Sequence, residues 1–205
     1  MIHGVTRLAL LALALAGCAP APATLVVSVR TDLVPGVELA AVETVVIDGF
    51  ALEVLRNRVP ALAADDYLAG VEVARDSDLT PGPYDVRVTL LDSSDTTVLE
   101  RRVRVDVATT RDELITLTRT CAGVTCPGAG EDVALSECLA GRCVTVGCND
   151  EHPERCADTE CAEDADCPAM GSACVQASCV EGSCLYAPDD TICAGARCDF
   201  IDGCG

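Results

Sequence analysis

Fourteen of the fifteen cysteines in this chain lie between positions 121 and 204, and this crowding constrains the fold more than any other feature. They are Cys121, Cys126, Cys138, Cys143, Cys148, Cys156, Cys161, Cys167, Cys174, Cys179, Cys184, Cys193, Cys198 and Cys204. The same stretch has few large aliphatic or aromatic residues, so it cannot bury enough apolar surface to fold on a hydrophobic core alone. Disulfides that each contribute ~2–4 kcal/mol would replace that core. We therefore predict a small disulfide-rich repeat region over residues 119–205, with little regular secondary structure.

The cysteines are also periodic. Triplets with spacing C-x4-C-x4-C or C-x4-C-x5-C begin at positions 138, 156, 174 and 193. A fixed period predicts a small unit that stacks on its neighbours. Because each triplet holds an odd number of cysteines, some bridges must join different units. The spacing leaves the pairing open, since fourteen cysteines allow on the order of 10^5 combinations.

Zinc is the rival use for so many cysteines. Zinc sites are usually built from C-x2-4-C pairs, and the C-x4-C pairs of this chain lie at the edge of that range. However, no C-x2-C occurs, and His152 is the only histidine beyond position 3. The absence of C-x-x-C also disfavours a thioredoxin-like redox site. Four acidic groups could hold a cation, although none matches the calcium-loop pattern; they are Asp65–Asp66, Asp76/Asp78, Glu163–Asp166 and Asp189–Asp190. We interpret them as solvated turns, and we predict no metal and no cofactor.

The first eighteen residues read as an export signal. Arg7 precedes an unbroken apolar run, Leu8–Ala16, which is too short to cross a hydrocarbon core of ~30 Å as a permanent helix. The segment Leu15-Ala16-Gly17-Cys18 closely resembles the lipobox of bacterial lipoproteins. In that family the signal, here residues 1–17, is removed, and the cysteine, here Cys18, is lipidated. The alternative is an ordinary cleaved signal in which Cys18 is incidental.

The lipobox resemblance has two further implications. The family retains proteins at the inner membrane by an Asp after the cysteine, and Ala19 stands there instead. The resemblance thus implies a lipid anchor in the outer membrane, on its periplasmic or its cell-surface face. Residues 18–23 form the lipidated cysteine and an Ala-Pro tether, of which five extended residues reach only about 15 Å. Setting Cys18 aside leaves an even number of cysteines, as a fully paired exported domain requires.

Residues 24–118 contain no cysteine and read as short strands separated by turn residues. The expected strands are 25–29, 42–47, 51–55, 68–74, 84–91, 99–107 and 114–118. In 99–107 apolar and charged residues alternate except at Arg101, which is typical of a strand with one solvated face. Seven such segments predict an antiparallel β-sandwich. Residues 59–68 have a competing interpretation as one or two helical turns.

The stretch Pro81–Val88 is a Pro-Gly turn that feeds a strand starting with Tyr84. It resembles the late strands of immunoglobulin-like and transthyretin-like bacterial modules. The combination of lipobox, β module and acidic cysteine repeats resembles predicted cysteine-rich surface lipoproteins of some Gram-negative bacteria. That resemblance implies a lipid-anchored envelope protein, and it implies no particular activity.

The net charge of the chain and the motifs it lacks disfavour several classes of function. A net charge of -19 disfavours nucleic acid, since phosphate binding needs clustered Lys and Arg, and it disfavours anionic lipid surfaces. We found no nucleophile–base motif, so we predict no enzymatic activity. The leading hypothesis is a non-catalytic binding, adhesion or structural display module with an unknown protein or glycan ligand. The alternatives are a passive envelope spacer and a disulfide-stabilised inhibitor or effector of a protease or receptor, presenting the loop 127–137.

Overall fold

The computed structural model describes residues 21–156 and 160–205. Cys18 and the signal segment 1–17 lie outside the described residues. The chain between Ala23 and Leu117 forms seven strands, in keeping with the mostly β fold expected from the sequence. Their bounds are β1 (Ala23–Thr31), β2 (Ala41–Asp48), β3 (Glu53–Pro60), β4 (Val71–Leu79), β5 (Gly82–Leu91), β6 (Thr97–Val107) and β7 (Thr110–Leu117).

These strands form a three-stranded sheet, in the order β4-β1-β7, and a four-stranded sheet, in the order β3-β2-β5-β6. Buried side chains of both sheets belong to one hydrophobic cluster, which includes Val27, Val29, Val46, Val86 and Val105. The cluster follows from the strand period of two: in β6 every second side chain is buried, because successive residues point to opposite faces. The β region thus has a core of its own whose buried residues include no cysteine, although the partly buried Cys121 packs against it.

Three details differ from the sequence prediction. The pairing of β1 with β7 is parallel, whereas we expected antiparallel pairs throughout. β3 begins at Glu53 and continues through Pro60, beyond the expected strand 51–55, and most of its residues are exposed or half-buried because it is an edge strand. Residues 59–68 contain no helix; after Pro60 the chain continues in turns and irregular structure to β4.

The cysteine-rich region has more regular structure than we expected. It holds three two-stranded hairpins: β8 (Glu137–Leu139) with β9 (Arg142–Val144), β10 (Val175–Val180) with β11 (Ser183–Pro188), and β12 (Cys198–Asp199) with β13 (Gly203–Cys204). Four short 3-10 helices complete the described part: η1 (Arg119–Cys121), η2 (Pro153–Arg155), η3 (Asp164–Asp166) and η4 (Asp190–Cys193).

The C-x4-C spacing corresponds to a tight hairpin in two of these cases. Cys138 lies opposite Cys143, and Cys179 lies opposite Cys184. The two residues at each tip, Ala140-Gly141 and Glu181-Gly182, have φ values of 51° and 74°, and of 50° and 77°. Positive φ at both central residues is the requirement of a type I′ turn, which matches the twist of the flanking strands. Glycine at the second position meets this requirement without steric strain.

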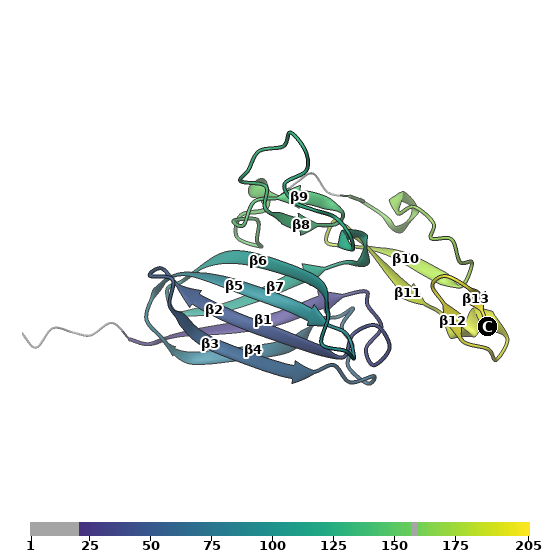
Figure 1. The fold of residues 1–205 in the computed structure, drawn as a ribbon, viewed down its shortest axis with the longest axis horizontal. Coiled ribbons are helices and arrows are strands. Elements are labelled where there is room, and N and C mark those ends of the chain that lie inside the picture. The colour runs from purple at the N-terminus through teal and green to yellow at the C-terminus, as the bar shows by residue number, and fades with distance from the viewer. Residues whose placement is uncertain (1–20, 157–159) are drawn as a thin grey trace, which may run out of the picture.

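Figure 1 shows how the two regions are arranged. β1 starts at one end of the β region, and the C-terminal end of the chain lies at the opposite end of the molecule. The β8–β9 hairpin lies over β6, and a backbone hydrogen bond of 2.7 Å from Arg104 N to Val146 O joins the segment after β9 to that strand. The β10–β11 hairpin extends beyond the far end of the sheets, towards the C-terminus (Figure 1).

Candidate functional site at the junction of the two regions

All fourteen cysteines of the repeat region are paired in seven disulfides, so the prediction of a disulfide framework is confirmed. The pairs are Cys121–Cys138, Cys126–Cys143, Cys148–Cys156, Cys161–Cys179, Cys167–Cys184, Cys174–Cys198 and Cys193–Cys204. Only Cys193–Cys204 lies within a single triplet. The other bridges join a triplet to its neighbour or to the opening Cys121/Cys126 pair, as the odd count per triplet requires.

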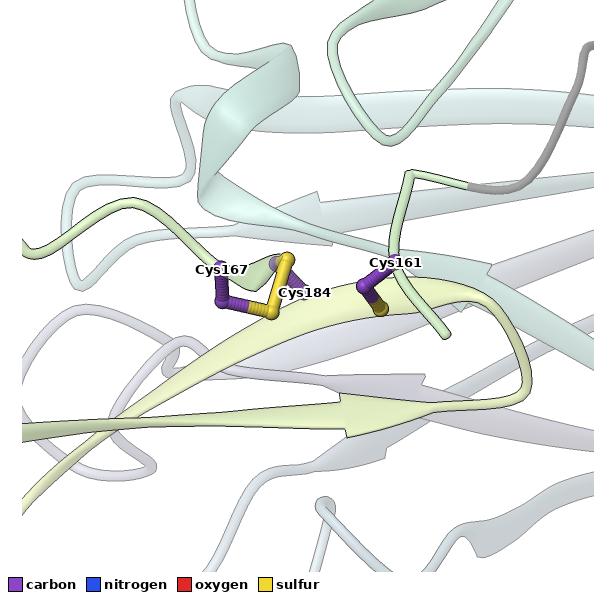
Figure 2. Close-up of side chains that lie close together, drawn as sticks. All are labelled: Cys161, Cys167 and Cys184. Carbon is purple, nitrogen blue, oxygen red and sulfur yellow. A yellow bond between two sulfur atoms is a disulfide. The ribbon is translucent and has the colours of Figure 1, made fainter. Parts of the chain in front are cut away.

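Two groups of three sulfur atoms lie close enough to suggest metal ligands. The Sγ atoms of Cys161, Cys167 and Cys184 lie within 4.8 Å of one another, and so do those of Cys174, Cys193 and Cys198. Figure 2 shows the Cys167–Cys184 disulfide beside the sulfur of Cys161, which is itself bonded to Cys179. A metal ligand must be a thiolate, and these sulfurs are oxidised. Their proximity results from stacked disulfides.

The acidic groups singled out in the sequence hold turns together. Asp66, Asp76, Asp166 and Asp189 each accept a hydrogen bond from a backbone N–H within four residues. These bonds lower the pKa of Asp166, since each backbone donor favours the charged carboxylate. Such local bonds are the ordinary use of Asp in turns. Asp32 and Arg119 have more important roles, although the sequence analysis singled out neither of them.

His152 also has a local partner. Its Nδ1 lies 3.1 Å from Glu154 Oε1, and the histidine side chain is about one-third exposed. No hydroxyl or thiol of a described residue is paired with this ring. The loop around His152 is instead organised by Asn149, whose Oδ1 accepts hydrogen bonds from the backbone N–H groups of Glu151 and His152.

The most concentrated polar cluster joins the β region to the cysteine-rich region at the end of β1. Asp32, whose side chain has no solvent exposure, accepts hydrogen bonds from Arg119 N at 2.7 Å and from Tyr186 N at 3.3 Å. The guanidinium of Arg119 donates to the Asp32 backbone carbonyl and to both carboxylate oxygens of Glu38. Its central carbon lies 3.4 Å from the centroid of the Phe200 ring. One carboxylate and one guanidinium thus tie β1, the interregion connection and two distant disulfide-linked segments together.

Burial dominates the electrostatics of this cluster. Removal from water raises the pKa of the Asp32 carboxyl to about 6, and the hydrogen bonds and the charge of Arg119 only partly oppose that rise. The nearby side chain of Tyr67 is also buried, and desolvation raises the pKa of its phenol to about 12. Both residues border a small recess of about 210 Å³ that Tyr186 and Pro188 of β11 help to enclose.

A second set of contacts ties β6 to the first disulfide loops. Arg101, only 5% exposed, donates to the carbonyls of Thr116 at 3.0 Å and Cys148 at 3.1 Å. Burial lowers the pKa of its guanidinium to about 10, although nearby Glu113 opposes this effect. Arg101 is the residue that broke the alternation expected in this strand. Its side chain enters the interface because the packed disulfide loop provides carbonyl acceptors there.

A cleft of about 390 Å³ borders this second set of contacts. It is lined by Arg101, Glu113, Asn149, Glu181 and Ser183, among others. Glu113 is paired with Arg111 at 2.5 Å, and Glu181 with Arg30 at 2.8 Å. The described lining residues include no histidine and no free thiol. The Arg111–Glu113 pair lies within β7, whereas Arg30–Glu181 joins the β region to the cysteine-rich region.

No family model, no curated protein and no solved structure matches this chain. Within residues 21–156 and 160–205, the structure contains no helix with the length and apolar character needed to cross a membrane.

Proposed function

We propose that this protein is a lipid-anchored outer-membrane protein, without catalytic activity, that displays its cysteine-rich region as a binding or adhesion module. The observation that carries the proposal is the order of the parts along the molecule. The chain enters the β region at Ala23, at one end, and the cross-linked segments from β10 onwards lie at the opposite end (Figure 1). An anchor at Cys18 would therefore hold the disulfide-rich end away from the bilayer.

The rigidity of the junction supports this role. Asp32 and Arg119 at the end of the sheets, and Arg101 along β6, fix the cysteine-rich region against the β region through buried hydrogen bonds. Burying polar groups is favourable only when their partners are fixed, so these contacts favour one orientation of the displayed region. We further propose that the two sheets form an immunoglobulin-like sandwich, with their shared cluster of buried side chains as its interior.

Two measurements test the anchor and the display. Intact mass of the membrane-extracted protein, with and without alkylation, reports acyl chains on Cys18 and counts free thiols together. An epitope appended after Gly205 should bind antibody on intact cells if the protein faces the medium. An epitope detected only after the outer membrane is permeabilised would leave a periplasmic protein and remove the adhesion role. Amine-directed surface labelling is unsuitable, because the chain has no lysine: all 14 basic residues are arginine.

One loop favours the alternative function of a protease or receptor inhibitor. Residues 127–137 lie between Cys126 and Cys138, and the bridges Cys121–Cys138 and Cys126–Cys143 hold the two ends. Val133 within this loop is 84% exposed. A constrained loop with an exposed apolar side chain binds with a smaller loss of conformational entropy. Inhibition of any member of a protease panel by the whole protein, abolished by Val133→Asp, would favour this function over adhesion.

A further inference from the structure

The three connections at the end of the β region where β1 begins contain no charged residue. They are the β2–β3 connection, Gly49-Phe50-Ala51-Leu52, the β4–β5 connection, Thr80-Pro81, and the β6–β7 connection, Ala108-Thr109. Their common location follows from the pairing, since Ala23 lies opposite Leu79 and Thr24 opposite Thr110. Asp48, which precedes the β2–β3 connection, pairs with Tyr84 near the start of β5. We call these three connections the uncharged end.

The other end of the same sheets has the opposite composition. Its three connections, residues 32–40, 61–70 and 92–96, together contain six carboxylates. These are Asp32, Glu38, Asp65, Asp66, Asp92 and Asp95. In a chain with a net charge of -19, an end without any charged connection residue is a marked departure. Charged groups are strongly disfavoured where a surface enters the apolar part of a bilayer, and their absence is expected of a surface that does.

Two large apolar side chains project from the uncharged end. Phe50 is 87% exposed and Leu52 is 63% exposed. Their connection is well ordered by hydrogen bonds: Asp48 Oδ1 accepts from Phe50 N and from Leu52 N, both at 2.9 Å. Ala51 between them adopts a left-handed conformation with φ of 63°. The turn therefore presents both side chains to the surroundings in a fixed geometry, and it does so without burying either.

Chain length places this end close to the proposed anchor. Cys18 is three residues from Ala21, the first described residue, and an extended chain reaches at most ~3.6 Å per residue. The Cα atom of Cys18 would thus lie within ~11 Å of that of residue 21, and β1 starts two residues later. Phe50 lies at the same end of the sheets, so a bilayer that holds the acyl chains would be within its reach.

We infer that the uncharged end is a second membrane contact, in which Phe50 and Leu52 insert into the lipid surface beside the acyl anchor. This inference rests on the proposed lipid anchor at Cys18. Carboxylates at the adjoining strand ends limit insertion to the shallow interfacial layer, where apolar side chains are buried ~5–10 Å. They are Asp48, Glu53, Asp78 and Asp106. The contact is apolar and not electrostatic, so a zwitterionic lipid suffices. It would fix the tilt of the β region and direct the cysteine-rich region away from the membrane.

The absence of tryptophan in this chain permits a direct test with Phe50→Trp as the only indole. Ile201→Trp is a closely matched control, because Ile201 is 89% exposed at a hairpin tip near the opposite end, and its N–H also donates to an Asp two residues earlier. Both variants are extracted from membranes, reconstituted into phosphatidylcholine vesicles, and their acylation is checked by mass. Doxyl groups placed on the lipid chains serve as quenchers.

The expected result is blue-shifted emission and strong quenching by the doxyl lipid for Phe50→Trp, and neither effect for Ile201→Trp. Leu52→Trp provides a second reporter, with the same expected result, should Phe50→Trp fold poorly. An acylated protein whose Phe50→Trp and Leu52→Trp emission matches the control would overturn this inference and leave the anchor intact. A blue shift without quenching would assign the loop to a protein contact, such as a second copy, and also overturn it. An unacylated product would remove both proposals.

Discussion

The carboxylate of Asp32 accepts a hydrogen bond of 2.7 Å from the backbone N–H of Arg119, although 87 positions separate the two residues. The same carboxylate accepts from Tyr186 N, 154 positions away. Asp32 follows β1, Arg119 begins the cysteine-rich region, and Tyr186 lies in β11. A single buried side chain thus links the core of the β region to the disulfide framework, and its charge makes that link sensitive to pH.

We expect the folded protein to become more stable as the medium becomes mildly acidic, because protonation removes the cost of keeping the buried Asp32 carboxylate charged. Burial raises the pKa of the Asp32 carboxyl from 3.8 to about 6, so the folded chain binds the proton more tightly than the unfolded chain. The resulting stabilisation is complete below pH ~4 and is lost as the pH rises through about 6. A shift of this size corresponds to roughly 3 kcal/mol. Burial also raises the pKa of the Glu113 carboxyl, so its effect on stability has the same sign.

Asp32→Asn tests this expectation because it removes the titrating group and keeps one oxygen acceptor. Denaturant unfolding at pH 7 and pH 5 should show a smaller difference in the free energy of unfolding for the variant than for the wild type. Asp92→Asn is the control, since hydrogen bonds from Thr96 and Ser94 lower the pKa of that carboxyl, which therefore stays ionised at both pH values, and its loss should leave the difference unchanged. An unchanged difference in Asp32→Asn would show that Asp32 does not titrate in this range.

Arg101 should contribute more to stability than its neighbour Arg102. Arg101→Met keeps most of the side-chain volume but leaves the carbonyls of Thr116 and Cys148 without their donor. Unpaired buried acceptors cost about 1–3 kcal/mol each, so we expect a loss of that order in the free energy of unfolding. Arg102→Met removes a partly exposed guanidinium whose side chain is 43% accessible, and it should change stability by less than ~0.5 kcal/mol. Equal effects of the two substitutions would argue against the role given to Arg101.

The sequence predicted the β region better than the junction, for a physical reason. β6 alternates buried and solvated residues from Leu99 to Val107, and that period is visible in the sequence itself. β3 was placed poorly because an edge strand has few buried positions, and the parallel β1–β7 pair leaves no local pattern. Asp32 and Arg119 could not be identified, because each depends on partners brought close by the fold. Arg101 alone gave a signal, as a charged residue at an apolar position.

The disulfide pairing could not be predicted from the sequence either. The odd number of cysteines in each triplet nevertheless indicated that some bridges join different units. Cys138 and Cys143 lie opposite each other in one hairpin, yet each is bonded to a cysteine that precedes the hairpin. Gly141 at the tip is a local signal for a turn, but it carries no information on the pairing of the cysteines. The lipid anchor at Cys18 stays a prediction, because that residue lies outside the described part of the chain.

Reduction should unfold the cysteine-rich region and leave the β region folded. The cluster around Tyr186 is small and consists largely of disulfide cysteines. The buried residues of the β core include no cysteine, and among the bridged cysteines only Cys121 packs against it. Hydrogen exchange after reduction and alkylation should show lost protection in β10 and β11 and retained protection in β2 and β5. Unreduced, alkylated protein is the control. Loss of protection in both regions together would mean that the junction makes them one cooperative unit.

The last prediction concerns the phenol of Tyr67, whose removal should raise the stability of the protein. Its side chain is 2% exposed, and its hydroxyl has no hydrogen-bond partner among the residues that the structure describes. A buried hydroxyl without a partner lowers stability, so Tyr67→Phe should raise the free energy of unfolding by about 1 kcal/mol. Tyr84→Phe is the matched control, because the Tyr84 hydroxyl donates to Thr80 O at 2.5 Å and its loss should lower stability by about 1 kcal/mol. Thermal unfolding of both variants at pH 7 decides the point: a destabilised Tyr67→Phe would reveal a partner for that hydroxyl, such as an ordered water in the recess beside Asp32.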